Sequence, residues 1–263
     1  MSKAIFHLPF NGNNYNLENL KNQSKIAILV HILYEDLINE ILNKTNNIPV
    51  KYDLFLSTDS TINATYINEI IKAKSLANFY EIKIYENKGR NIFPFFLQIK
   101  ARIKNYKYIC HLHTKKSTFP YFVDEWRKYL YNNLLGNTII ISEIITDFEN
   151  NDKLGFIFPE TFHKVMIEYK TEITQKDKYF IKHFLKKLKL NKSLRLEEQE
   201  EFPIGNMFWA KTDSIHQIFY FNLEREIQLK NQLDANLIYG IERIWLYLVE
   251  LNGYFYKKIF KHF

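Results

Sequence analysis

The stretch Lys25–His31 (KIAILVH) decides the fold class of this chain. A short, continuous apolar run of this kind is typical of a strand that is buried on both faces, as in a parallel sheet. Three further runs read as strands: Tyr52–Ser57 (YDLFLS), Phe79–Tyr85 (FYEIKIY) and Tyr106–His111 (YKYICH). Between them, apolar residues recur at helical spacing. The alternation predicts an α/β fold with a Rossmann-type, mostly parallel sheet that is flanked by helices.

The later part of the chain extends this unit. Apolar periodicity predicts one more strand and several helices: Leu154–Pro159 as the strand, and Asp124–Leu135, Thr138–Asn150 and Asp234–Leu251 as helices. No repeat and no linker interrupts the pattern. We therefore expect an irregular arm over residues 1–24 and a single compact domain over residues 25–263, with a helical C-terminal portion.

The composition excludes several classes of protein. The chain has 263 residues, of which 46% are hydrophobic and 25% charged, and this profile is globular rather than disordered. No apolar run approaches the roughly 18 residues of a membrane span. Residues 1–10 do not form a convincing signal peptide, because His7 and Pro9 interrupt their apolar stretch. The single cysteine, Cys110, cannot form an intrachain disulfide, so we expect a cytoplasmic protein.

The chain is basic, with 36 basic and 29 acidic side chains and a formal charge of +7. This balance favours anionic partners. Nucleic acid is disfavoured among them, because the basic residues are scattered and no nucleic-acid-binding motif occurs. The last segment, Tyr254–Phe263 (YFYKKIFKHF), mixes aromatic and basic residues and is the candidate for a peripheral, salt-sensitive membrane contact. A packed strand or helix is the alternative for this segment.

Polar clusters follow three of the predicted strands. They are Ser57–Ser60 (STDS), Glu86–Asn91 (ENKGRN) and His111–Ser117 (HLHTKKS). In open parallel sheets, ligands bind beyond the carboxyl ends of the strands, so we expect these clusters to meet at one edge. Glycine allows close approach of the backbone, and arginine and lysine suit phosphate oxygens. The clusters predict a site for a phosphate-bearing ligand, with the candidates Asp59, Asn87, Gly89, Arg90, His111, His113, Lys115 and Lys116.

His111 and His113 are two residues apart, so in an extended chain their imidazoles point to the same face. The pair could hold a metal, bind a diphosphate or form a hydrogen-bonded structural pair. Coordination by two histidines without a nearby carboxylate is incomplete, and Asp59 is no more than a candidate for a third ligand. Phosphate binding is favoured over metal binding.

Two later segments, Gly205–Trp209 and Glu242-Arg243, are candidates for an acceptor-binding part of the site. The glycine and aromatic residues of Gly205–Trp209 suit a pocket wall that stacks on a sugar, although a core strand with a glycine bulge would also fit. In the second, Glu242 and Arg243 interrupt an apolar helix, where a carboxylate can act as a base and where a surface pair is the alternative. The candidates for the acceptor pocket are Gly205, Asn206, Met207, Phe208, Trp209 and Arg243.

In these segments the sequence resembles the rhamnan synthesis protein F family of bacterial polysaccharide glycosyltransferases. The matching stretches follow the family's order and cover nearly all of the chain after residue 24. One departure is Asn91, where the family usually has Asp. The stretches are Val30–Leu42 (VHILYEDLINEIL), Tyr52–Thr58 (YDLFLST), Glu86–Phe96 (ENKGRNIFPFF), Tyr108–Ser117 (YICHLHTKKS), Leu154–Glu160 (LGFIFPE), Ile204–Lys211 (IGNMFWAK) and Tyr239–Trp245 (YGIERIW).

The resemblance implies a GT-A-like, inverting glycosyltransferase. It would transfer rhamnose or a related hexose from a nucleotide-diphosphate sugar to a cell-surface polysaccharide or lipid-linked glycan. Residues 25–160 would form the donor half and residues 161–263 the acceptor half. A non-catalytic domain that binds a nucleotide sugar or a glycan is the alternative function.

The resemblance also implies roles for individual residues. Related enzymes carry an Asp-x-Asp motif, which holds a divalent metal, where this chain has His111-Leu112-His113. A divalent cation (Mn²⁺ or Mg²⁺) therefore stays an open alternative to positive charge from Arg90, His113 and Lys115. The base is assigned to Glu242, with Asp234 as the alternative.

Overall fold

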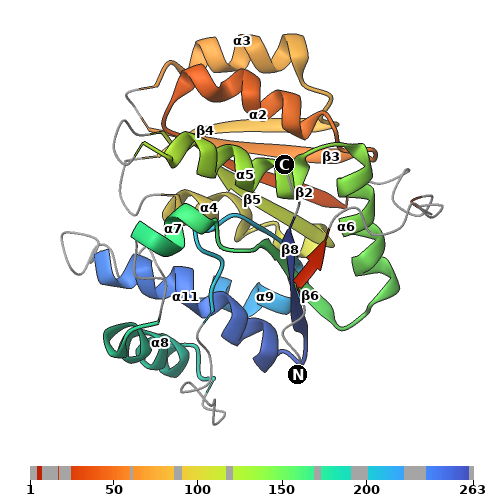
Figure 1. Ribbon diagram of the computed structural model, residues 1–263. Coiled ribbons are helices and arrows are strands. Elements are labelled where there is room, and N and C mark those ends of the chain that lie inside the picture. Colours follow the sequence, from red (N-terminus) through yellow and green to blue (C-terminus); the bar gives the residue numbers. More distant parts are fainter. Residues whose placement is uncertain are drawn as a thin grey trace.

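The computed structural model describes residues 5–7, 17, 25–59, 62–85, 91–116, 121–168, 173–190, 201–221 and 235–260. Within this part of the chain, eight strands form one sheet with helices on both faces (Figure 1). Their order is β1-β8-β6-β7-β5-β2-β3-β4. The strands are β1 Ile5–His7, β2 Ile26–Ile32, β3 Tyr52–Thr58, β4 Phe79–Ile84, β5 Tyr108–His113, β6 Leu154–Pro159, β7 Phe208–Lys211 and β8 Phe255–Phe260.

The sheet is mostly parallel, because every pairing is parallel except those of β7, which runs antiparallel to both β5 and β6. All seven residues of β2 are buried, as its continuous apolar sequence requires. The predicted α/β fold with a mostly parallel sheet is therefore confirmed. The predicted boundary of β5 was two residues early, and His113 lies inside the strand rather than after it.

Two apolar cores cover the two faces of the sheet. Residues of α2, α3, α5 and α6 belong to one core, and residues of α4, α8, α9 and α11 belong to the other. The helices are η1 Glu35–Leu37, α2 Ile38–Thr45, α3 Ala64–Lys74, α4 Ile92–Ile99, η2 Ile103–Asn105, α5 Val123–Leu135, α6 Thr138–Asn150, α7 His163–Glu168, α8 Gln175–Lys187, α9 Thr212–Ile215, η3 His216–Tyr220 and α11 Ala235–Leu251. Among these helices, none combines the length and hydropathy that a membrane span needs.

The segment proposed for membrane contact is largely a strand. β8 lies between β1 and β6, and its basic side chains have partners inside the fold. Lys257 pairs with Asp147, and Lys258 Nζ lies 2.9 Å from Glu201 Oε1. The lysine side chains are only 12% and 13% exposed. Lys257 and Lys258 therefore pair with carboxylates of the fold and are not presented to a lipid surface, as the alternative of a packed strand requires; residues 261–263 lie outside the described part of the chain.

Candidate functional site

Polar side chains gather where β3 and β5 end, as the sequence predicted, and also where β2 ends; the third predicted cluster, after β4, lies outside the described residues except for Asn91. The strand registers pair His31 with Ser57 of β3 and with His113 of β5. Alternation along β2 and β5 turns His31, His111 and His113 to one face of the sheet, the face that α4 and α11 cover. His31 was not predicted, although its position at the end of a buried apolar run was a usable signal.

His31 is buried and neutral. Its Nδ1 lies 3.0 Å from Ser57 Oγ. Burial lowers the pKa of His31 to about 4, although the Asp59 carboxylate opposes this change. Asp59 is itself 4% exposed, so the structure brings this predicted residue to the edge, beside the imidazole.

His111 is packed among aromatic rings. Its ring centroid lies 4.5 Å from that of Phe95 and 5.5 Å from that of Phe208. Burial and the neighbouring His113 hold the pKa of His111 well below its usual range, although the backbones of Asn206 and Asn91 lie close enough to oppose this in part. Neither ring nitrogen makes a hydrogen bond of ordinary geometry within the described ranges.

Gly205 connects His113 to Glu242. His113 Nε2 lies 2.8 Å from the Gly205 carbonyl oxygen, and the Gly205 N–H donates to Glu242 Oε1 at 3.2 Å. Burial lowers the pKa of His113 to about 4, so the ring is neutral, and we assign its proton to Nε2 because Nδ1 lies farther, at 3.2 Å, from its nearest carbonyl oxygen, that of Thr114. The structure thus brings together a predicted phosphate ligand, the pocket glycine and the predicted base.

The two lysines after β5 point to different places. Lys115 Nζ lies 3.6 Å from the centroid of the Trp126 ring, a cation–π contact beside Gly205. Lys116 Nζ lies 2.6 Å from Asp36 Oδ2 and is exposed, so it points away from His111 and His113. The buried guanidinium of Arg127 donates to the Lys115 carbonyl at 2.7 Å and so fixes the backbone between the two lysines. The sequence did not predict this role for Arg127.

The predicted aromatic wall is wrong for β7. Phe208 and Trp209 are 0% exposed and Met207 is 1% exposed, because β7 lies in the interior of the sheet between β5 and β6. Trp209 Nε1 donates to the Leu134 carbonyl at 3.1 Å, which fixes this indole in the core. None of these side chains offers a free ring face to a sugar.

Arg243 and Asn206 also differ from expectation. Arg243 Nε lies 3.2 Å from Asp177 Oδ1 of α8, and its guanidinium lies 4.4 Å from the centroid of the Phe202 ring. It therefore supports the packing of α11 against α8 rather than an acceptor pocket. Asn206 has a positive φ of 53° and its Oδ1 accepts from Trp245 Nε1 at 2.9 Å, which places this amide beside the cluster.

The other predicted residues lie outside the described residues. They are Asn87, Gly89, Arg90 and Asp234. Their roles stay predictions from the sequence.

Several buried side-chain nitrogens around His111 have no hydrogen-bond partner within the described part of the chain. Buried polar groups in folded proteins are nearly always paired, so a group of unpaired ones indicates a place where a polar ligand or water binds. The atoms are His31 Nε2, Asn91 Nδ2 and Asn206 Nδ2, and the two ring nitrogens of His111 have only the nearby backbones of Asn206 and Asn91 as weak partners. The cluster is suited to a ligand rich in oxygen acceptors.

A metal site is not evident from these residues. The centroids of His111 and His113 are 6.3 Å apart, and His113 Nε2 is engaged by a carbonyl oxygen. Over the ranges that the structure describes, no group of three His, Cys, Asp or Glu side chains is placed to hold a metal ion. The donor set of the described residues alone does not fit a divalent cation.

Comparison with known proteins identifies the family. The family model described as rhamnan synthesis protein F matches residues 6–254. The chain belongs to the rhamnan synthesis protein F family. The resemblance that the motifs indicated is therefore confirmed over nearly the whole chain.

Two curated relatives and two solved structures show more distant similarity. An uncharacterized protein WxcX of Xanthomonas campestris pv. campestris is 25% identical over 222 residues in each of two strains, and the alignment covers 82% of this chain but 30% of the relative. This chain thus spans less than a third of the length of those relatives. The mannosyltransferase Ktr4p from S. cerevisiae in complex with GDP aligns with a TM-score of 0.41 at 10% identity, over 89% of this chain and 70% of that one. A second structure of that protein gives a TM-score of 0.39 at 10% identity, over 85% and 66%.

Proposed function

We propose that this chain is a glycosyltransferase domain that takes a sugar, rhamnose or a related hexose, from a nucleotide-diphosphate sugar and transfers it to a glycan acceptor. The observation that carries the proposal is the cluster of unpartnered buried nitrogens at the carboxyl edge, in a chain of the rhamnan synthesis protein F family. Ligands of open α/β sheets bind at this edge. A diphosphate and a sugar together present many oxygen acceptors to N–H donors.

In this proposal the donor diphosphate lies over the ends of β2 and β5. The imidazoles of His31 and His111 are neutral, and each has one N–H to donate. Lys115 supplies a cation once it leaves the Trp126 ring, and Arg90, in the segment after β4, supplies a second. Donors and cations of this kind stabilise the negative charge that develops on a leaving diphosphate.

Glu242 is the proposed base. Its carboxylate is half-buried and is held in place by the Gly205 N–H. In an inverting transfer, the acceptor hydroxyl oxygen attacks the anomeric carbon and gives its proton to this carboxylate. The bond from the anomeric carbon to the diphosphate oxygen breaks, and its electron pair leaves with the nucleoside diphosphate. Asp234 stays the alternative base.

A non-catalytic domain that binds a nucleotide sugar or a glycan is the second candidate. It is favoured by the fact that His113 and Glu242 both contact Gly205, which gives each of them a structural role in the loop. Measuring the release of nucleoside diphosphate separates this candidate from a transferase.

The experiment starts with a thermal-shift screen of nucleotide sugars, with and without Mn²⁺, because a ligand that binds only the folded state raises Tm. Glu242→Gln can still accept from the Gly205 N–H but has lost the base. Donor affinity should therefore persist while transfer falls by about 10²–10⁴-fold. Asp234→Asn is the control and should be mild; the reverse result would exchange the two assignments. If no nucleotide sugar shifts Tm, the proposal is wrong.

The acceptor and the cellular location belong to the same proposal. A lipid-linked glycan at the inner face of the membrane would suit a cytoplasmic enzyme of polysaccharide synthesis, for capsule or lipopolysaccharide. The structure offers no role for Lys257 and Lys258 in such a contact, since both pair with carboxylates of the fold.

A further inference from the structure

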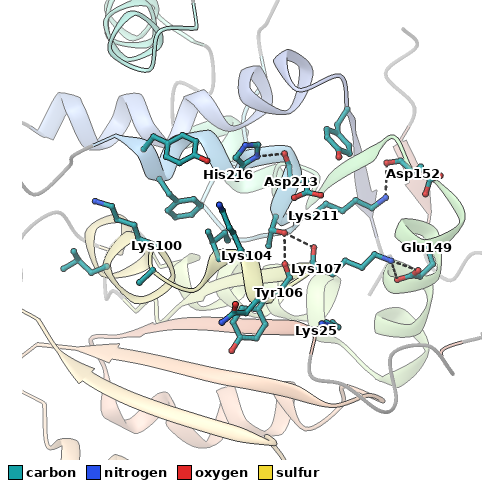
Figure 2. Close-up of a pocket in the computed structure, with 18 residues that line it drawn as sticks. Lys25, Lys100, Lys104, Tyr106, Lys107, Glu149, Asp152, Lys211, Asp213 and His216 are labelled. Carbon is teal, nitrogen blue, oxygen red and sulfur yellow. Dashed lines mark hydrogen bonds and ion pairs between the residues drawn. The ribbon is translucent and has the colours of Figure 1, made fainter.

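A cavity of about 1600 Å³ opens at the edge of the sheet opposite to the candidate site, where β2 and β5 begin (Figure 2). Lys25 precedes β2, Lys107 precedes β5, and Lys211 ends the antiparallel β7. One wall comes from α4 and η2, and the other comes from α9 and η3. Pockets for drug-sized ligands are commonly about 300–1,000 Å³, so this one has room for an extended ligand.

At one end of the cavity the charges are matched. Lys107 Nζ lies 2.7 Å from Glu149 Oε2. The Lys211 ammonium donates to the carbonyl oxygens of Asn151 and Asp152 at 2.7 and 3.1 Å, and burial lowers its pKa. Figure 2 shows these groups together on the right.

At the other end the cations are in excess. Lys100, at the end of α4, and Lys104, in η2, line this part of the cavity, whereas Lys25 lies next to Lys107 (Figure 2); within the described ranges none of the three lysines makes an ion pair. In Figure 2, Lys100 and Lys104 lie below His216, away from Glu149 and Asp152. Like charges that converge on a concave surface raise the local concentration of anions.

Tyrosines also line the cavity. Tyr220 is 69% exposed, and its ring meets that of His216 edge to face at 5.9 Å. Tyr254, half-buried, lines the cavity near Lys211. A tyrosine presents an apolar ring face together with a hydroxyl, and this combination suits a ligand that has apolar faces and many hydroxyls.

We propose that this cavity binds an anionic glycan, a sugar chain that carries carboxylate or phosphate groups. The lysines would contact the anionic groups, the Tyr220 ring would contact a sugar face, and the volume admits several sugar units. The cavity is built from residues that the proposed donor site does not use, so the two sites can be tested separately.

The test measures the binding of fluorescent oligogalacturonate to the whole chain by anisotropy, without any nucleotide. We expect binding that weakens as salt rises, and no competition by neutral dextran oligosaccharides. The double variant Lys100→Gln/Lys104→Gln should bind about 4- to 25-fold more weakly, since each exposed ion pair contributes about 2- to 5-fold. The control Lys182→Gln/Lys186→Gln has the same spacing and charge change on α8 and should bind like the parent.

A second pair of variants tests whether the ligand is a glycan whose sugar ring contacts Tyr220. Tyr220→Ala should weaken binding, while Tyr179→Ala on α8, which removes a ring of similar exposure (67%), should not. Equal binding by the parent and both lysine variants would overturn the proposal. Full competition by inorganic pyrophosphate at equal affinity, with no effect of Tyr220→Ala, would overturn the glycan assignment. Failure of the transferase proposal would show in the donor screen and not in this assay.

Discussion

The backbone of Gly205 makes two hydrogen bonds, one with a residue that the sequence assigned to phosphate binding and one with the residue that it assigned as the base. His113 donates to the carbonyl oxygen, and Glu242 accepts from the N–H. Removing either side chain would therefore disturb the loop as well as any ligand contact. For this reason Glu242→Gln is more informative than Glu242→Ala, and His113→Ala is a poor probe of donor binding.

Gly205 itself should be difficult to replace. Its φ of 95° is strained for any residue with a side chain, and an added Cβ would lie 3.0 Å from Leu130 Cδ1 and 3.1 Å from Trp126 Cζ2. We expect Gly205→Ala to lower the free energy of unfolding by about 1–3 kcal/mol, measured by urea unfolding. Gly253→Ala is the control, because φ is 76° there but nothing lies within 4 Å of the added Cβ. Equal losses in the two variants would show that the contacts with Leu130 and Trp126 do not matter.

At the scale of elements, the alternation of β2 and β5 explains why three imidazoles share one buried face. This face was predictable for His111 and His113, because strand periodicity is local. The burial of Trp209 was not, because it depends on β7 entering the sheet between strands that are distant in sequence. The pairing of Lys257 with Asp147, 110 residues away, was hidden for the same reason.

The buried imidazoles should make stability depend on pH. The pKa values of His31 and His113 are about 4 in the folded chain, against 6.5 for an unperturbed imidazole. As pH falls below 6.5 the unfolded chain takes up protons first, so the contribution of these residues is complete above pH 6.5 and is lost as pH approaches 4. Each residue should contribute about 3 kcal/mol to this loss.

Urea unfolding from about pH 7 to about pH 4.5 measures this slope. His31→Gln removes one of the titrating groups and should make the dependence shallower. If the variant keeps the slope of the parent, His31 is not held neutral in the folded chain.

At the scale of the whole molecule, one sheet separates two proposed sites. The carboxyl edge holds the cluster around His111, and the amino edge holds the cavity lined by Lys100 and Lys104. The sequence predicted the first edge, because polar residues follow apolar runs there. It did not predict the second, because the wall of α9 and η3 that closes the cavity is adjacent to Lys100 and Lys104 only in the folded chain. The excess of basic residues alone could not locate either site.

The position of the donor site can be tested by replacing two arginines from the same half of the chain. Arg90 belongs to the segment after β4, which the proposal assigns to the diphosphate, whereas Arg102 pairs with Glu81 at 3.3 Å and lies 4.9 Å from the centroid of the Phe55 ring. Arg90→Ala should weaken the binding of the nucleoside diphosphate, measured by calorimetry, by about 10- to 100-fold, because it removes a charge-assisted hydrogen bond. Arg102→Ala has the same change in net charge and should leave that affinity unchanged. Equal weakening would mean that only the overall charge of the protein matters, and parental binding by Arg90→Ala would show that Arg90 does not bind the donor.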